Sequence, residues 1–124
     1  MPLRLTALVA ALMLAGPVHA ADRIKVGFVS TLSGPGAGLG VDIRDGFNLA
    51  IRQLDGKLGG LPAEIIVADD QQNPDIAKQT ADKFLKKDKV DFMTGIVFSN
   101  IMLAVGPQVF ENKTFYISAN AGPS

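Results

Sequence analysis

An apolar segment that runs directly into a loop of small, hydroxyl-bearing residues is the feature that most constrains the fold of this sequence. Residues 24–29 read Ile-Lys-Val-Gly-Phe-Val, and residues 30–36 follow as Ser-Thr-Leu-Ser-Gly-Pro-Gly. A short apolar run bounded by turn residues is typical of a strand buried in a parallel sheet. Open α/β sheets bind ligands in the loops that follow such strands. We therefore expect a ligand site at this loop.

The first twenty residues have the three parts of a secretory signal peptide. Arg4 gives the positive start, residues 5–15 are apolar, and Val18-His19-Ala20 forms a small-residue cleavage site. The apolar part is shorter than the roughly 20 residues that span a bilayer. We expect this signal peptide, residues 1–20, to be removed on export to the periplasm, with no membrane insertion of the mature chain. A retained anchor is the alternative.

Charge and cysteine content exclude several classes of partner. Removing Arg4 leaves eleven Lys and Arg against twelve Asp and Glu, because every acidic residue lies beyond residue 21. A chain this close to neutral has no basic footprint for nucleic acid or for an anionic membrane. Because the sequence has no Cys, disulfides, thiolate metal sites and an acylated cysteine are excluded. We expect no nucleic-acid partner, no metal and no cofactor.

Hydrophobic periodicity alternates between strand and helix from residue 24 onward. The expected strands are residues 24–30, 63–68, 90–94 and 114–118, and the expected helices are 41–54, one that starts at 73–75, and 100–110. Five aromatic residues at core spacing are expected to pack inside: Phe47, Phe84, Phe92, Phe110 and Phe115. This order predicts an α/β fold in which an open parallel sheet is flanked by helices on both faces.

Four loops are expected to meet at the carboxyl edge of that sheet: residues 30–34, 69–73, 95–100 and 118–122. Three of them are rich in Ser, Thr, Asn and Gly, which offer hydroxyls, amides and backbone N–H groups rather than acids, bases or metal ligands. This composition indicates a binding surface. The sequence stops directly after the last expected strand, where a further helix would cover the sheet, so we expect a truncated product or a fragment of a longer chain.

The main enzyme classes built on α/β sheets are not supported. Residues 34–39 read Gly-Pro-Gly-Ala-Gly-Leu, which puts Leu at the last glycine of the dinucleotide motif G-x-G-x-x-G. A serine hydrolase would need a base, yet no His follows His19, and Ser99 lacks the G-x-S-x-G setting. Asp69 and Asp70 could be read as a metal pair or a ribose-binding acid, but more simply they end a strand. We expect no enzymatic activity.

Six stretches together resemble a known family. They are residues 24–34, 45–51, 59–62, 67–74, 95–100 and 116–121. Their order and spacing are similar to those of periplasmic substrate-binding proteins of the branched-chain amino acid type, the type I periplasmic binding proteins that serve ABC importers. The resemblance implies that residues 21–124 form part of the N-terminal lobe of a two-lobed solute-binding domain, incomplete at its C-terminus. The second lobe would close on the ligand by a hinge.

The resemblance also implies a ligand site. Ser99 matches the family serine that grips a ligand carboxylate, and Asn120 and Gly122 fall where neighbouring backbone and a threonine hydroxyl assist. With the residues of the first loop, the candidate ligand-binding set is Ser30, Thr31, Ser33, Phe98, Ser99, Asn100, Asn120, Ala121 and Gly122. Two structural alternatives stay open: Ser99 could be a helix N-cap, and the residues of the first loop could be turn formers.

The function implied is that of an extracytoplasmic binding protein that captures an amino acid or a related small carboxylate and delivers it to ABC transporter permease subunits. Gly122 departs from the family threonine, and Phe98 adds an aromatic ring, so we hypothesise a ligand that need not be an α-amino acid, for instance an aromatic acid. The alternative is the ligand-sensing ectodomain of a signalling receptor with the same lobe fold. Alone, this chain is expected to bind poorly because half of the ligand cage is missing.

Overall fold

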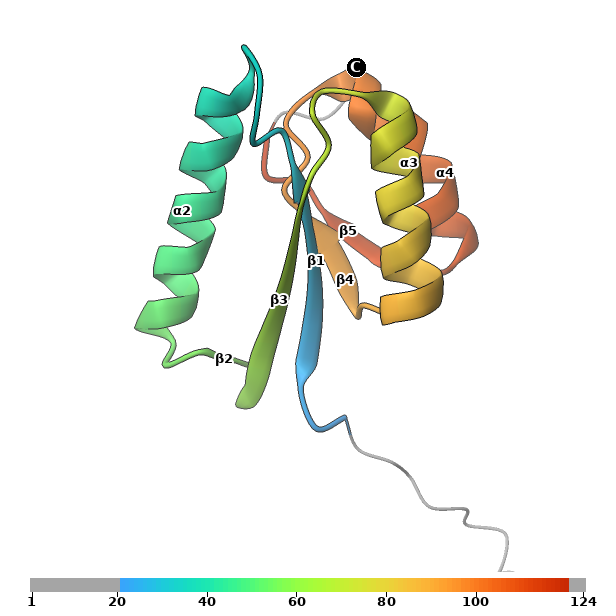
Figure 1. The fold of residues 1–124 in the computed structure, drawn as a ribbon. Coiled ribbons are helices and arrows are strands. Elements are labelled where there is room, and N and C mark those ends of the chain that lie inside the picture. Colours follow the sequence, from blue (N-terminus) through green and yellow to red (C-terminus); the bar gives the residue numbers. More distant parts are fainter. Residues whose placement is uncertain (1–20, 121–124) are drawn as a thin grey trace, which may run out of the picture.

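The computed structural model describes residues 21–120, so the predictions made on residues 1–20 and on Ala121 and Gly122 lie outside the described residues. One mixed sheet carries helices on both faces (Figure 1). In chain order the elements are β1 (Ile24–Ser30), α2 (Ala37–Gln53), β2 (Lys57–Leu58), β3 (Leu61–Asp69), α3 (Pro74–Asp82), the π-helix η1 (Lys83–Asp88), β4 (Phe92–Thr94), α4 (Ser99–Glu111) and β5 (Phe115–Ile117).

The four main strands run in the same direction, as the sequence predicts. The strand order is β2-β3-β1-β4-β5, and β1 pairs in parallel with both β3 and β4, while β4 pairs in parallel with β5. The chain therefore moves to one side of β1 to form β3 and then crosses to the other side to form β4. Their carboxyl ends share one edge of the sheet, which is where such folds place ligand sites.

The short strand β2 was not expected from the sequence and makes the sheet mixed. It pairs antiparallel with the start of β3 through the pairs Lys57–Pro62 and Leu58–Leu61. Gly59 and Gly60 join the two strands with φ angles of 56° and 84°. Two consecutive residues with positive φ form the tight turn that hairpins prefer, and glycine adopts it without steric cost. The Gly-Gly pair between two leucines was the available signal.

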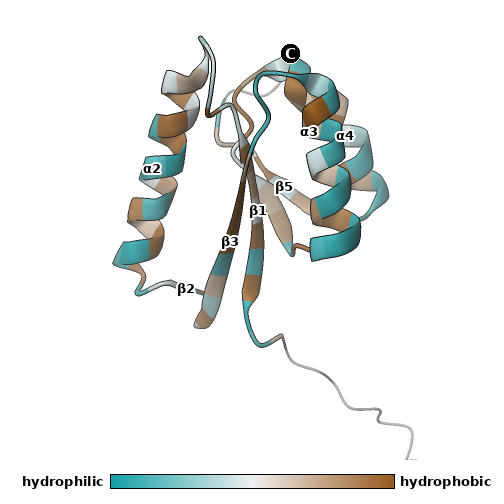
Figure 2. Cartoon of the chain, in the orientation of Figure 1, coloured by the Kyte–Doolittle hydropathy of each residue, from teal (hydrophilic) through white to brown (hydrophobic). Residues whose placement is uncertain are grey.

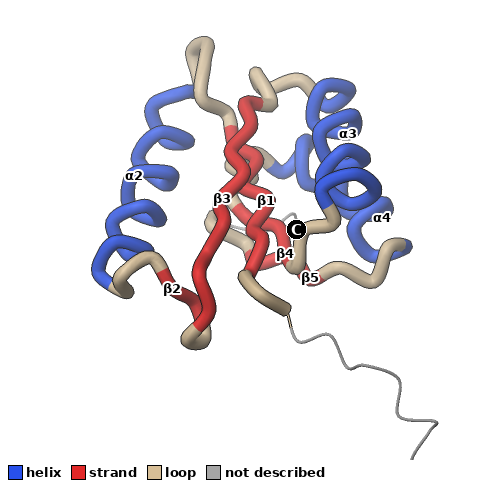
Figure 3. The backbone as a smooth tube through the Cα atoms, turned by 60° about the horizontal axis from the view of Figure 1, so that its bottom comes forward, coloured by secondary structure: helices blue, strands red, loops and turns tan. Residues whose placement is uncertain are grey.

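Helices α3 and α4 cover one face of the sheet and enclose the main core (Figures 1 and 3). Val29 and Met93 from the sheet pack in one buried cluster with Phe84, Ile101 and Val105 from the helical side. In Figure 2, β3 is brown through its upper half, where four consecutive apolar residues reach the sheet centre. The run is nevertheless only partly covered, since Val67 is exposed.

Helix α2 covers the opposite face only in part. Its packing includes a contact between the rings of Phe28 and Phe47, whose centroids lie 5.3 Å apart. Toward the edge strand β5 this face is open: Phe115 is 79% exposed and Ile117 is 56% exposed. Two of the expected core residues are thus not packed inside the described chain, because Phe115 lies on this uncovered strand and Phe110 is 65% exposed on α4.

The starts of α3 and α2 show which sequence signals predict the first residue of a helix and which do not. Asn73 caps α3 as expected, accepting hydrogen bonds from the N–H groups of Asp75 and Ile76, with Pro74 at the first helical position. Helix α2, in contrast, begins at Ala37, four residues before the predicted start. Gly38 and Gly40 lie in its first turn, and glycine has low helix propensity, so the sequence pattern gave no helical signal there.

Candidate functional site

The carboxyl ends of β1 and β3, called their exits below, are joined to each other by hydrogen bonds between the loops that follow them. The N–H of Asp70 donates to the carbonyl of Ser30 at 2.9 Å, and the Thr31 hydroxyl donates to Oδ1 of Asp70 at 2.6 Å. Asp69 accepts from the N–H of Leu32 at 2.8 Å. These bonds join two loops that are nearly forty residues apart in the sequence, and they fix one half of the edge at which the strands end.

The two carboxylates that end β3 organise their own loop as well. Gln71 and Gln72 both have positive φ angles, which cost free energy for residues with side chains. Their N–H groups donate at 2.8 Å to Asp69 and Asp70, which offsets that cost. Within residues 21–120, no group of three or more His, Asp or Glu side chains is placed to hold a metal ion. The hydrogen bonds of Asp69 and Asp70 give the pair a structural role at the end of β3.

The pKa of Asp69 lies below its usual value of 3.8. Burial would raise this pKa, but hydrogen bonds from the Ser33 side chain and from the N–H groups of Leu32, Gln71 and Ser33 outweigh that effect by stabilising the anion. Ser33 is exposed, yet its side chain is engaged with Asp69. In this conformation Ser33 therefore helps to fix the turn that follows β1.

Ser30 and Thr31 are buried beneath the surface of the protein, whereas a residue that contacts a ligand must be exposed to it. Both are 0% exposed, so neither offers surface to a solute in this conformation. The first turn of α2 lies on top of them, since a Cβ placed on Gly40 would be only 1.9 Å from the Thr31 carbonyl oxygen. Glycine at this position permits the close approach. Ser30 and Thr31 therefore pack beneath the first turn of α2. Their burial depends on a contact with another element, which the sequence pattern does not show.

The exits of β4 and β5 are joined to each other in a similar way. The amide Nδ2 of Asn120 donates to the carbonyl of Val97 at 2.9 Å. The Tyr116 hydroxyl accepts from the N–H of Ile96 at 3.2 Å, and burial raises the pKa of Tyr116 to about 12. Tyr116 therefore remains neutral at physiological pH. Asn120, predicted as a ligand contact, is exposed and fixes the loop that leads into α4.

The N-terminus of α4 lies at this same edge and is not capped by a side chain. Phe98 is the residue before the helix, with extended backbone angles (φ −102°, ψ 140°), and no side chain forms a capping hydrogen bond. The N–H groups of Ile101 and Met102 both donate to the Phe98 carbonyl, whereas Ser99 and Asn100 are exposed in the first turn. Ser99 is thus the first helical residue rather than the N-cap. An uncapped helix start presents N–H groups and a positive dipole end, which favour an anion.

The loops after β1, β3 and β4 meet at Gly36, the residue before α2. A Cβ placed there would lie 2.9 Å from Cε2 and Cζ of Phe98 and 2.9 Å from Oε1 of Gln72. The ring of Phe98 is half-buried and also packs against the main core. The structure therefore brings Phe98, Ser99, Asn100 and Asn120 together on the side of β4 and β5, with Gly36 and Gln72 added. Sequence reasoning missed these last two.

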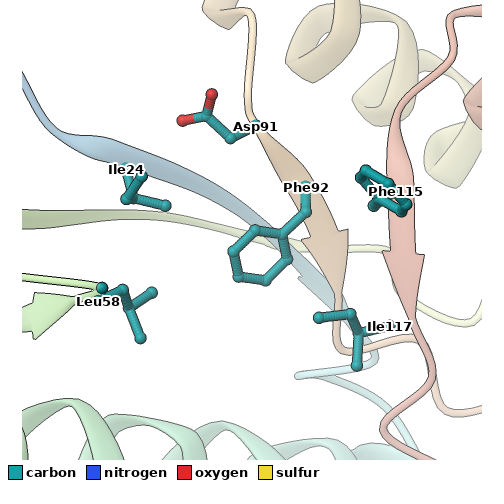
Figure 4. A pocket seen from close by; sticks show the side chains of 7 residues that line it. Ile24, Leu58, Asp91, Phe92, Phe115 and Ile117 are labelled. Carbon is teal, nitrogen blue, oxygen red and sulfur yellow. The ribbon is translucent and has the colours of Figure 1, made fainter. Parts of the chain in front are cut away.

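A separate apolar cavity of about 440 Å³ is lined mainly by residues at the starts of β1, β4 and β5, on the face of the sheet that α2 covers in part. The side chains of Ile24, Leu58, Phe92 and Ile117 point toward a common space, and the Asp91 carboxylate points away from it (Figure 4). The residues that line this cavity include no Lys, Arg or His to pair with a carboxylate ligand. Its walls continue the uncovered apolar surface of β5, and we do not assign the solute site to it.

Comparison with known proteins gives the family. The sequence profile of the family described as "Periplasmic binding protein" matches residues 23–124. This chain belongs to the periplasmic binding protein family. A Leu/Ile/Val-binding protein homologue (homolog 6) of Brucella abortus is 30% identical over 121 residues, which cover 97% of this chain and 31% of that relative. The chain thus spans about a third of the length of the curated relative, and the predicted resemblance to the branched-chain amino acid type is confirmed.

Solved structures confirm the predicted fold. An ABC transporter substrate-binding protein from Sphaerobacter thermophilus superposes with a TM-score of 0.78 and 31% identity, over 82% of this chain and 28% of that one. A solute-binding protein of an ABC transporter from Rhodopseudomonas palustris, solved in complex with benzoate, gives a TM-score of 0.75 and 31% identity over 80% and 28%. This periplasmic binding protein chain matches the first lobe of its relatives. In residues 21–120 no helix has the length and apolar character needed to cross a bilayer.

Proposed function

We propose that this chain supplies the first lobe of an extracytoplasmic receptor that binds a small carboxylate and delivers it to the permease of an ABC importer. The observation that carries the proposal is the uncapped start of α4 at the edge where the strands end. Membership of the periplasmic binding protein family supports the transport role. Export to the periplasm follows from the same role and from the predicted signal peptide.

The physical basis is recognition of an anion by oriented dipoles. The N–H groups of Ser99 and Asn100 and the Ser99 hydroxyl are the donors we assign to the carboxylate. Hydrogen bonds to an ionised acceptor are stronger than those between neutral groups, and the helix dipole adds a favourable field within the first turn. Asn120 keeps the next loop in place through its bond to Val97. A carboxylate would therefore be held without a cationic side chain.

We further propose that the ligand is an aromatic carboxylate. Phe98 directly precedes the donors of α4, so a ring attached to a bound carboxylate would lie within reach of its aromatic face. Aromatic pairs in offset or edge-to-face arrangements are favourable beyond their apolar contact. The Rhodopseudomonas palustris relative that was solved with benzoate supports this class of ligand. Isoleucine is the appropriate competitor, because the curated relative carries a Leu/Ile/Val-binding name.

Titration of the ¹⁵N-labelled chain with benzoate and with isoleucine, followed by NMR, tests the proposal even when binding is weak. We expect the amide signals of Ser99 and Asn100 to shift with benzoate. Ser99→Asp should abolish these shifts because a fixed carboxylate would occupy the anion position. Gln79→Glu adds the same charge at an exposed position of α3 and serves as the matched control. Saturating shifts located at the apolar cavity instead of at α4 would overturn the assignment.

Location can be tested independently of binding. We expect a fusion of the complete chain to alkaline phosphatase, which is active only after export, to show phosphatase activity in bacterial cells. Replacing Arg4 and two of the apolar residues that follow it by acidic residues should remove that activity. Equal activity with and without these substitutions would contradict export through residues 1–20.

A further inference from the structure

The contact between Phe98 and Gly36 differs in kind from the close approach at Gly40. At Gly40 the nearest atom is a backbone oxygen, so an added side chain could not be accommodated without moving the chain. At Gly36 the nearest atoms are the far edge of the Phe98 ring and the end of the Gln72 side chain. The backbone of Gly36 has a negative φ of −86°, which every L-residue can adopt. A methyl group at position 36 would therefore displace the ring and leave the fold intact.

The position of the ring matters because of what adjoins it. Phe98 connects β4 to α4, and its carbonyl accepts the hydrogen bonds that start the helix. One edge of the ring lies against Gly36, and the partly buried ring also packs against the main core. The ring is thereby held between the loop after β1 and the interior. A shift of about an ångström in a side chain beside a binding site is enough to change which ligands fit.

We propose that Gly36 is a positioning residue for Phe98, and that the pair makes this site select planar aromatic carboxylates over branched aliphatic ones. The proposal rests on the carboxylate-binding function proposed above and adds its selectivity. Gly36 supplies the space in which the ring lies, and the ring in turn presents a flat apolar surface next to the N–H groups of Ser99 and Asn100. Gly36 itself contacts no ligand in this scheme.

The test compares the same substitution at two glycines that lie two residues apart, one just before α2 and one in its first turn. Gly36→Ala should reduce the ratio of benzoate to isoleucine affinity by about two- to tenfold, the size of effect that aromatic contacts contribute. Gly38→Ala is the matched control, because a Cβ there meets nothing within 4 Å, and it should leave the ratio unchanged. In a Phe98→Leu background, which removes the ring, Gly36→Ala should have no further effect on the ratio. An unchanged ratio in Gly36→Ala, or equal losses in both backgrounds, would overturn the proposed pair.

A second measurement tests the positioning without any ligand. In the unsubstituted chain we expect nuclear Overhauser contacts between the Phe98 ring protons and the Gly36 Hα protons. In Gly36→Ala these contacts should weaken and the ring-current shift of residue 36 should decrease, while the amide spectrum of the core stays unchanged. Absence of the contacts in the unsubstituted chain would refute the positioning role. Binding of both acids at a place other than Ser99 and Asn100 would instead refute the proposed function, and the selectivity with it.

Discussion

The Thr31 hydroxyl donates a 2.6 Å hydrogen bond to the buried carboxylate of Asp70, and this bond joins the exits of β1 and β3. Both residues are 0% exposed. Oδ1 of Asp70 also accepts from the N–H of Gln72, so one oxygen of a single carboxylate holds two loops. The edge of the sheet that carries the candidate site depends on this contact, because losing the donor would leave a buried carboxylate oxygen with fewer hydrogen bonds.

Thr31→Val should destabilise the chain by about 1–3 kcal/mol, since it removes the donor of a buried hydrogen bond while keeping the side-chain shape. The measurement is the free energy of unfolding from urea denaturation. Thr114→Val is the control, because the Thr114 hydroxyl makes only a 3.4 Å bond near the surface. Equal losses in the two variants would contradict a special role for the Thr31–Asp70 bond.

Gly40→Ala should destabilise the chain by at least about 1–3 kcal/mol, the usual cost of overpacking. The added Cβ would lie 1.9 Å from the Thr31 carbonyl oxygen, so α2 must move away from the β1 exit. Thermal unfolding followed by circular dichroism measures the loss. Gly46→Ala lies in the same helix with nothing within 4 Å of its Cβ and should be neutral or stabilising by up to about 1 kcal/mol. If the Gly40→Ala variant were as stable as Gly46→Ala, the close contact between α2 and the Thr31 carbonyl would be contradicted.

Acid should weaken the loop after β3 through Asp69. Because the folded-state pKa of Asp69 is lower than its ordinary value of 3.8, its hydrogen bonds contribute stability that is present above about pH 4 and is lost as the pH falls through the folded pKa. Asp69→Asn removes this titration. We expect the free energy of unfolding of the variant to fall less steeply between pH 4 and pH 2 than that of the unsubstituted chain. Parallel pH profiles would contradict the assignment of the lowered pKa.

Phe115→Lys should reduce binding of the apolar dye ANS, because Phe115 is 79% exposed beside the apolar cavity on the uncovered face of the sheet. Dye fluorescence at a fixed protein concentration measures the effect. The control is Leu103→Lys, because Leu103 is also an exposed apolar residue, 64% exposed on α4. A buried residue such as Phe84 would not serve, since a lysine there would disrupt the core. A decrease no larger than that of the control would show that the face next to β5 is not the main dye-binding surface.

Much of the fold could be predicted from local patterns. The first strand was expected at residues 24–30 and is observed there, because an apolar run followed by turn-forming residues is a local signal. The cap at Asn73 was found for the same reason: its side chain bonds to N–H groups only two and three residues away. The parallel direction of the four main strands followed from the alternation of strand and helix.

The environment of the candidate site could not be predicted in the same way. Whether Ser30 and Thr31 face a solute or lie beneath a helix depends on Gly40 and on Asp70, which is 39 residues from Thr31. Phe98 and Gly36 come from different loops, and only folding brings them into contact. Phe110 and Phe115 had the spacing of core residues, but spacing does not reveal which face of a helix or sheet another element covers.

The sequence by itself determined the succession and common direction of the four main strands and which loops reach the binding edge, because periodicity, caps and turn residues act over a few neighbouring positions. The tertiary structure decided which residues of those loops are exposed, which carboxylates hold the loops together, and which side chain lies against which glycine. Those outcomes depend on hydrogen bonds and steric contacts between residues far apart in the chain, and such contacts exist only once the sheet has formed.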